Sequence, residues 1–132
     1  MNINIRGRLF DLSKPKVMGI LNLTPDSFYD GGVHNEINNI ENHVNMMVED
    51  GVDILDIGGY SSRPGAIDIT IDEELNRVIP IIKELKKIFP NLIISIDTFR
   101  SLVAEKSLDH GIDIINDISA GILDDNMFNV IA

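Results

Sequence analysis

Short apolar runs alternate with longer amphipathic segments along this chain of 132 residues. Four runs have the length and composition of buried strands, at residues 17–21, 54–57, 92–96 and 112–115. Between them, apolar residues recur at helical spacing over residues 35–50, 70–88 and 101–110. Apolar strands separated by helices are typical of a parallel sheet that is covered by helices or closed into a barrel. The pattern therefore predicts an α/β fold.

Local signals mark where several of these elements begin and end. Thr70 is followed by Glu73 at the spacing of a capping box, which predicts a helix start. Asp124 is in a position to cap a further helix that runs towards Ala132. Short alternation around Gly7 predicts a β-hairpin over residues 4–11. No linker or low-complexity tract interrupts the chain, so we expect a single domain over residues 1–132.

Each predicted strand of the sheet ends in a short polar side chain. These residues are Asn22, Asp56, Asp97 and Asn116. Ligands of parallel α/β sheets bind at the carboxyl ends of the strands, so the four side chains are expected to meet in one small pocket. The alternative for each residue taken singly is that it caps the following helix or loop. The repetition at four strand ends favours a binding site.

Two long loops carry further candidate chemistry. Residues 22–32 read NLTPDSFYDGG, and residues 58–65 read GGYSSRPG. The aromatic residues of the first loop either pack the loop down or cover a flat ligand. In the second loop, the Ser62 hydroxyl and the Arg63 guanidinium suit a phosphate or a carboxylate, although a single loop arginine is often only solvated.

Composition and charge exclude several classes of protein. The chain has 21 acidic and 11 basic residues, which argues against a general nucleic-acid binder. It has no cysteine for disulfides or thiolate sites, and no apolar run approaches the ~18 residues of a membrane span. A cytoplasmic protein that binds neither nucleic acid nor membrane is therefore expected. The acidic run at 72–74 is interpreted as a favourable first helical turn, not as a carboxylate site.

Longer motifs resemble the dihydropteroate synthase family of folate biosynthesis, the targets of sulfonamides. The motifs are GILNLTPDSFYDGG at 19–32, DIGGYSSRPGA at 56–66, ISIDT at 94–98 and IINDISAG at 114–121. The resemblance implies a TIM (β/α)8 barrel, of which this chain holds the N-terminal hairpin and about the first four β/α units. It also implies an enzyme that joins 6-hydroxymethyl-7,8-dihydropterin diphosphate to 4-aminobenzoate, giving 7,8-dihydropteroate and diphosphate.

The same resemblance implies roles for single residues. Asn22 would be the ligand of Mg²⁺, the implied cofactor, while Asp97 and Asn116 would hydrogen-bond the pterin ring. Ser62 and Arg63 would meet the diphosphate, which makes Arg63 and Asp97 the implied catalytic residues. The first loop would order over the substrates and help to form the aminobenzoate pocket through Thr24, Pro25, Asp26, Ser27 and Phe28.

The chain departs from the family pattern at two positions and in length. Tyr60 and Ser62 stand where the family commonly has Glu and Thr. A barrel of this type takes about 250 residues, so we expect an N-terminal fragment that does not turn over alone, from an enzyme that is a homodimer at full length. A non-catalytic pterin-binding half-barrel that self-associates is an alternative. A folate-dependent methyltransferase is a weaker one, because that group lacks the Thr-Pro-Asp-Ser-Phe loop.

Overall fold

The computed structural model describes residues 1–23, 33–60 and 68–132. Its elements alternate along the chain in the predicted order. They are β1 (Asn2–Ile5), β2 (Arg8–Asp11), β3 (Met18–Asn22), α1 (Val33–Glu49), β4 (Ile54–Gly58), α2 (Ile71–Ile88), β5 (Ile93–Asp97), α3 (Ser101–Asp109), β6 (Ile114–Asn116) and α4 (Met127–Ile131). The antiparallel pair β1–β2 confirms the predicted hairpin, with strands over 2–5 and 8–11.

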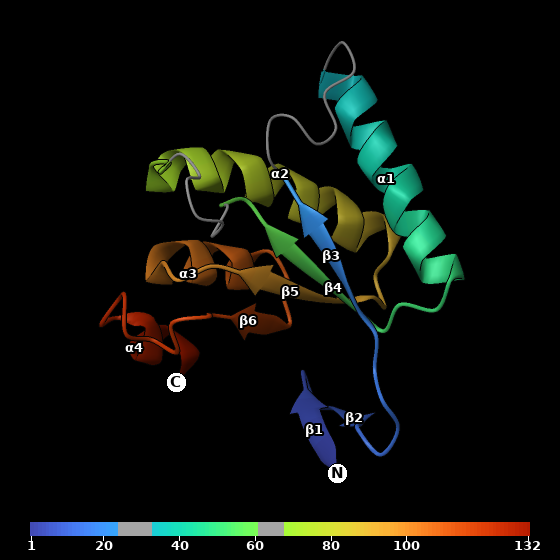
Figure 1. Ribbon diagram of the computed structural model, residues 1–132, viewed down its shortest axis with the longest axis horizontal. Coiled ribbons are helices and arrows are strands. Elements are labelled where there is room, and N and C mark those ends of the chain that lie inside the picture. Colours follow the sequence, from blue (N-terminus) through green and yellow to red (C-terminus); the bar gives the residue numbers. More distant parts are fainter. Residues whose placement is uncertain (24–32, 61–67) are drawn as a thin grey trace.

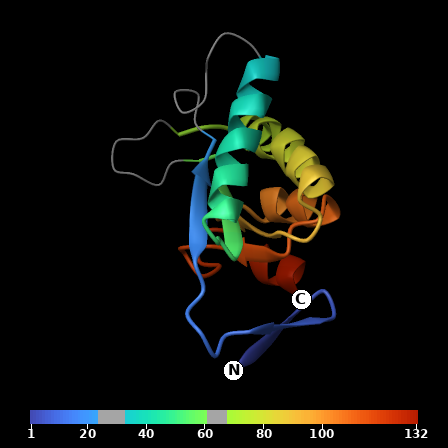
Figure 2. The ribbon, with the colours of Figure 1, turned by 90° about the vertical axis from the view of Figure 1, so that its right-hand side faces the viewer.

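The four strands that follow the hairpin form one parallel sheet in the order β3-β4-β5-β6. Each strand pairs with the strand before it in the sequence, and Figures 1 and 2 show α1, α2 and α3 on the same face of the sheet. A doubly wound sheet would reverse its strand order and place helices on both faces. Sequential order with helices on one side is the geometry of an arc of a (β/α)8 barrel.

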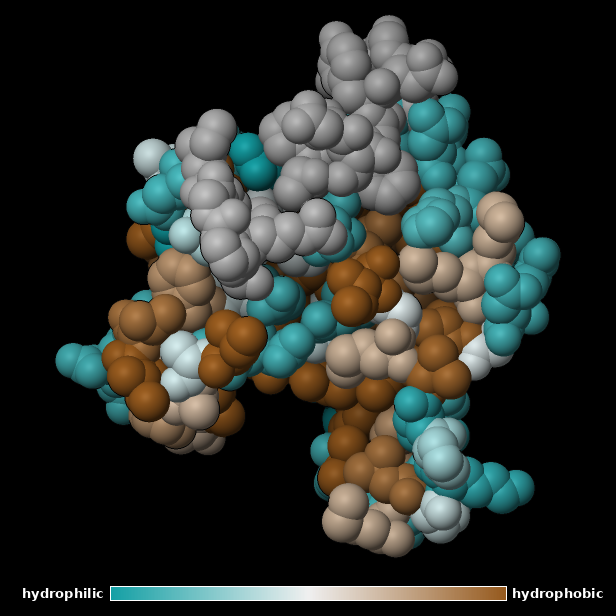
Figure 3. All heavy atoms as spheres, viewed as in Figure 1, coloured by the Kyte–Doolittle hydropathy of each residue, from teal (hydrophilic) through white to brown (hydrophobic). Residues whose placement is uncertain are grey.

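The core lies between the sheet and these helices. Every second residue of each strand in this sheet points towards the helices, and most of these residues are buried. The buried ones pack against apolar side chains of α1, α2 and α3. They include Leu21, Leu55, Ile57, Ile94 and Ile96. The opposite parity faces away from the helices, where Figure 3 shows hydrophobic residues gathered over the strands. On that face Ile20 is 63% exposed and Met18 is 43% exposed.

The predicted helix signals have different outcomes. The Thr70 hydroxyl accepts a hydrogen bond from the Glu73 amide at 3.1 Å, which confirms the predicted helix start. The prediction for Asp124 is wrong, because α4 begins after Asn126, which makes no side-chain cap. Asp124 Oδ1 accepts a hydrogen bond from the Asn126 amide at 3.0 Å, and its Oδ2 accepts from the Ser101 amide at 2.7 Å. Its carboxylate therefore caps α3, a helix that lies earlier in the chain but next to it in space.

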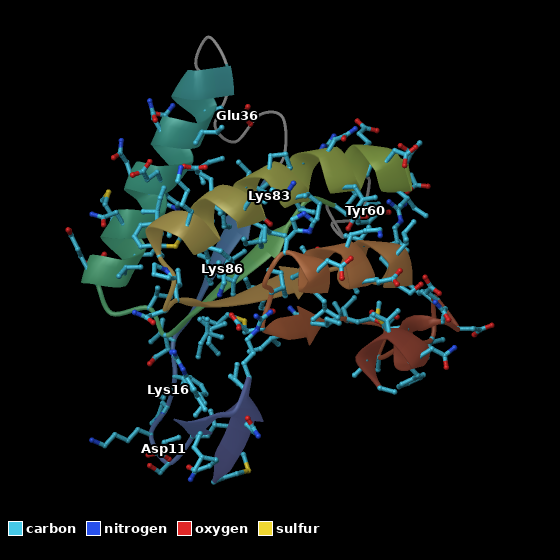
Figure 4. All side chains as sticks on the ribbon, turned by 180° about the vertical axis from the view of Figure 1, so that it is seen from behind. Asp11, Lys16, Glu36, Tyr60, Lys83 and Lys86 are labelled. Atoms are coloured by element: carbon cyan, nitrogen blue, oxygen red, sulfur yellow. The ribbon has the colours of Figure 1, made fainter. Side chains whose placement is uncertain are left out.

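A buried carboxylate joins the hairpin to the amino-terminal side of the sheet. Asp113 forms an ion pair with Arg6 Nε at 2.9 Å, and it accepts hydrogen bonds from Lys86 Nζ at 3.0 Å and from the Ile94 amide at 3.0 Å. Arg6 also donates to the Ile112 carbonyl at 2.8 Å. Lys86, labelled in Figure 4, reaches Asp113 from α2. One side chain thus ties together the hairpin, a helix and a central strand.

We expect Asp113→Ala to lower the free energy of unfolding by about 2–3 kcal/mol, because charged hydrogen bonds to a carboxylate that is only 6% exposed are lost. Urea unfolding of the purified protein followed by circular dichroism measures the change. Lys87→Ala is the matched control, since the exposed Lys87–Glu84 pair lies on the outer surface of α2 and its loss should change stability by less than about 0.5 kcal/mol. Equal midpoints for the two variants would contradict the anchoring role.

Candidate active site

Three of the four predicted strand-end residues lie in one row across the sheet. The strand register aligns Asn22 of β3 with Gly58 of β4, Gly58 with Asp97 of β5, and Asp97 with Asn116 of β6. All four positions have the parity that faces away from the core. Asn22 and Asn116 are exposed, and Asp97 is half-buried. Three of the four predicted side chains therefore lie on one face of the sheet, at the carboxyl ends of its strands.

The fourth predicted residue, Asp56, is not at the end of its strand. β4 continues to Gly58, so Asp56 aligns with Ile20 and Ser95, one row further from the strand ends. Only 5% of Asp56 is exposed, and its Oδ2 accepts a hydrogen bond from Asn116 Nδ2 at 3.0 Å. The carboxylate therefore lies beneath the row, as a partner of one of its members.

Gly58 leaves the centre of the row without a side chain. A Cβ atom at this position would lie 3.7 Å from the Asn22 Oδ1 and 3.7 Å from both the Cβ and the Oδ2 of Asp97. These are ordinary van der Waals distances, so the fold alone does not exclude alanine here. Because Gly58 has no side chain, the space between the Asn22 amide oxygen and the Asp97 carboxylate stays open, and a flat ligand there would contact both groups.

Gly58→Ala is expected to weaken ligand binding at this row by about tenfold or more while leaving stability nearly unchanged, because the new methyl group fills the site and not the core. Gly59→Ala is the matched variant. Its Cβ would lie 2.7 Å from Val78 Cγ1, so we expect overpacking to cost about 1–3 kcal/mol. Titration with a pterin, the ligand that the resemblance implies, and urea unfolding of both variants check the contrast. Loss of stability in Gly58→Ala without loss of binding would contradict it.

Asp97 lies in an acidic environment that disfavours its charged form. Partial burial raises the pKa of the Asp97 carboxyl above its usual value, and the nearby charges of Asp56, Glu74 and Asp117 raise it further. A ligand that donates hydrogen bonds or carries positive charge would relieve this repulsion. The site is therefore suited to a ring with N–H donors or cationic character.

Sequence reasoning missed a buried ion pair behind the site. Glu74 lies in the acidic first turn of α2, as predicted, but its side chain is fully buried and has a specific cationic partner. Glu74 Oε2 accepts from Arg100 Nη1 at 2.8 Å, and Oε1 accepts from the Thr98 hydroxyl at 2.8 Å. Thr98 directly follows Asp97, so the pair supports the segment that leaves the end of β5.

Arg100 also connects this segment to both sides of the second loop motif. Its Nη2 donates to the Ile69 carbonyl at 2.6 Å, and its guanidinium lies 5.2 Å from the ring centre of Tyr60 and 5.2 Å from that of Phe99. The two rings meet edge to face with centres 5.3 Å apart. Figure 4 places Tyr60 near the ends of α2 and α3. Tyr60, at the position where the resemblance predicts an acid, thus lies within cation–π distance of an arginine.

Other predicted site residues lie outside the described part of the chain. They are Thr24, Pro25, Asp26, Ser27 and Phe28 of the first loop, and Ser62 and Arg63 of the second. Within residues 1–23, 33–60 and 68–132, no three or more His, Cys, Asp or Glu side chains are grouped to hold a metal ion. The same part of the chain contains no helix long and apolar enough to cross a membrane. The cytoplasmic location stays a prediction.

Known proteins share this fold and these motifs. Residues 18–132 match the family described as "Pterin binding enzyme". The dihydropteroate synthase of Staphylococcus epidermidis is 46% identical over 124 residues, which cover 90% of this chain and 45% of that protein. The folic acid synthesis protein of Pneumocystis carinii is 51% identical over 116 residues, which cover 88% of this chain and 16% of that protein.

Solved structures agree with the sequence comparison. The dihydropteroate synthase of Xanthomonas albilineans with 4-aminobenzoic acid superposes with a TM-score of 0.88 at 40% identity, covering 98% of this chain and 48% of that one. The Yersinia pestis enzyme in complex with a sulfonamide drug superposes with a TM-score of 0.79 at 43% identity, covering 92% and 43%. These neighbours are TIM barrels, and this chain spans less than half the length of each. The chain therefore belongs to the pterin binding enzyme family and is similar over nearly its whole length to the dihydropteroate synthases of folate synthesis.

Proposed function

We propose that the complete gene product containing this chain joins 6-hydroxymethyl-7,8-dihydropterin diphosphate to 4-aminobenzoate, forming 7,8-dihydropteroate and diphosphate. The observation that carries the proposal is the row of Asn22, Gly58, Asp97 and Asn116 at the carboxyl ends of four parallel strands. Relatives named dihydropteroate synthase, one of them solved with 4-aminobenzoic acid, support the choice of substrates.

The pterin ring is the ligand that the described residues suit best. A fused ring with alternating N–H donors and ring-nitrogen acceptors is matched by a carboxylate and an amide held side by side. Asp97 accepts from ring donors, and Asn116 supplies an amide next to it. Gly58 leaves room for the ring to approach both side chains.

The reaction breaks the C–O bond between the pterin methylene and the diphosphate and forms a C–N bond to the amine of 4-aminobenzoate. The amine loses one proton to solvent, and diphosphate leaves with the bonding electron pair. Positive charge develops on the methylene and the ring as the C–O bond breaks, and the negative charge of Asp97 stabilises it. The amine is already a nucleophile, so it needs positioning more than activation.

The leaving group needs cations, which this acidic chain supplies at few places. Ser62 and Arg63 are proposed to bind the diphosphate, and Thr24, Pro25, Asp26, Ser27 and Phe28 to form part of the aminobenzoate pocket. Asn22 fits Mg²⁺, because a single neutral oxygen suits a cation that keeps most of its ligands as water and phosphate oxygens. When bound, Mg²⁺ would neutralise charge on the diphosphate.

Diphosphate release by the complete gene product tests the proposal. Release should require both 4-aminobenzoate and the pterin diphosphate, and mass spectrometry should identify 7,8-dihydropteroate as the product. A sulfonamide should compete with 4-aminobenzoate. Pterin binding without condensation under any of these conditions would contradict the proposed activity.

One structural feature favours a second function for the isolated 132-residue chain. Within the described residues, β3 and β6 each have a strand neighbour on one side only, and Met18 and Ile20 are exposed on the face without helices. Such edges and apolar surface promote self-association. We therefore propose, as the second candidate, that the isolated chain is a non-catalytic pterin-binding half-barrel that associates with itself. Size-exclusion chromatography and pterin calorimetry test this, and a monomer without pterin affinity would exclude it.

A further inference from the structure

A buried carboxylate that the proposed reaction does not use lies beneath the row of site residues. Asp56 is 95% buried, and one of its oxygens, Oδ2, accepts the hydrogen bond from Asn116 Nδ2 at 3.0 Å. Its other oxygen, Oδ1, has no partner among the described residues, and neither has the hydroxyl of Ser95, which is aligned with Asp56 on the adjacent strand. Burying a carboxylate costs folding free energy unless hydrogen bonds satisfy its oxygens, and here one oxygen is left unsatisfied.

The hydrogen bond from Asn116 has a directional consequence. An ionised carboxylate accepts hydrogen bonds and donates none, so only the NH₂ end of an asparagine amide can face it. With Nδ2 held by Asp56, Oδ1 of Asn116 points away from that carboxylate. No described residue donates a hydrogen bond to that oxygen. Asn116 therefore presents its carbonyl end to whatever occupies the site.

We propose that Asp56 is a positioning residue, which fixes the Asn116 amide so that a hydrogen-bond acceptor faces the ligand. This inference rests on the proposed function, since it specifies how the same site recognises the pterin. A free asparagine can rotate its amide and adapt to a donor or to an acceptor. The fixed amide removes that choice, so a ring presenting an N–H to Asn116 is preferred over an isosteric ring presenting a lone pair.

The test is a double-mutant cycle on pterin affinity in the complete gene product. Calorimetry with 6-hydroxymethylpterin is carried out on the parent protein, Asp56→Ala, Asn116→Ala and the double variant. We expect Asp56→Ala to weaken binding by about tenfold in the parent background and to have no further effect in the Asn116→Ala background. An equal loss in both backgrounds, or no loss in either, would overturn the inference.

Two further variants separate positioning from a general structural effect. Asp56→Asn retains an oxygen that can accept from Asn116, so its affinity should fall between those of the parent and Asp56→Ala. If Asp56→Ala does not fold, Asp56→Asn takes its place in the cycle. Ser95→Ala removes a buried polar atom from the adjacent strand without touching the Asp56–Asn116 pair, so it should bind like the parent. Weaker binding in Ser95→Ala than in Asp56→Asn would contradict a specific role for Asp56.

A readout without ligand keeps the inference separate from the proposed function. The side-chain NH₂ resonances of Asn116, assigned by ¹⁵N labelling, should show one restrained amide in the parent and lose that restraint in Asp56→Ala. If the parent does not bind pterin, the proposed function fails, while the NH₂ resonances still decide whether Asp56 orients Asn116. Identical resonances in the parent and in Asp56→Ala would overturn the inference even if pterin binds.

Discussion

Replacing Arg100 by methionine is expected to lower the free energy of unfolding by about 3–5 kcal/mol, the cost of leaving one member of a buried ion pair alone. Glu74 is fully buried, and the arginine is its cationic partner in the described structure. The same substitution removes the hydrogen bond to the Ile69 carbonyl and the cation–π contacts with Tyr60 and Phe99. Urea or thermal unfolding of the purified protein measures the loss.

A double variant shows whether the uncompensated charge is the cause. Arg100→Met together with Glu74→Leu should be more stable than Arg100→Met alone, because no charge is then left buried without its partner. Lys106→Met is the matched control on the same side of the sheet, since its pair with Asp109 is long, at 3.8 Å, and exposed. A double variant less stable than both single variants would show that packing, not charge, dominates.

In the complete gene product, Asp97→Asn is expected to lower kcat/KM for condensation by about 100- to 1,000-fold, which is typical of losing one preorganised electrostatic contact. The substitution keeps the shape of the side chain and removes the charge that faces the developing cation. It also removes the repulsion that raises the Asp97 pKa, so stability should be unchanged or improved. Steady-state kinetics and unfolding of the same preparation give both quantities.

The pH dependence of stability provides a second test of Asp97. The native pKa of Asp97 is raised above the usual value of an aspartate, so the native state binds more protons than the unfolded state between the two pKa values. Stability contributed by this group therefore falls as pH rises through that window. Asp97→Asn should abolish that fall. Asp109→Asn, at an exposed position on α3, is the control and should retain both the activity and the pH profile.

The order and class of the elements could be predicted because their signals are local. Apolar runs, helical spacing and the Thr70 cap depend on neighbours within a few residues. Strand ends are less certain, since the sheet neighbours of β4 decide that it continues to Gly58. The sequence pattern therefore predicts Asp56 one row nearer the strand ends than the structure has it.

Partner choice between distant segments could not be predicted. Asp124 has the sequence context of a cap for the next helix and accepts from the Asn126 amide there, yet its other oxygen accepts from the Ser101 amide of α3. Glu74 resembles its acidic neighbours in sequence and differs from them only because the helix turns it towards Arg100. Spacing along the chain does not predict which carboxylate becomes buried in the folded protein. The available signal was Arg100 in the DTFR sequence at 97–100. Its need for a buried carboxylate partner becomes apparent only when the folded sheet places it beside α2.

The sequential strand order also bears on how the polypeptide acquires its structure. Because each strand of the sheet pairs with its predecessor, most of the sheet has low contact order, and successive βα units can dock in turn as they leave the ribosome. The contact of Arg6 with Ile112 and Asp113 is the exception, since it spans 106 residues to Ile112. The hairpin therefore docks only after residues 112 and 113 have been synthesised, and until then we expect it to be open to proteolysis.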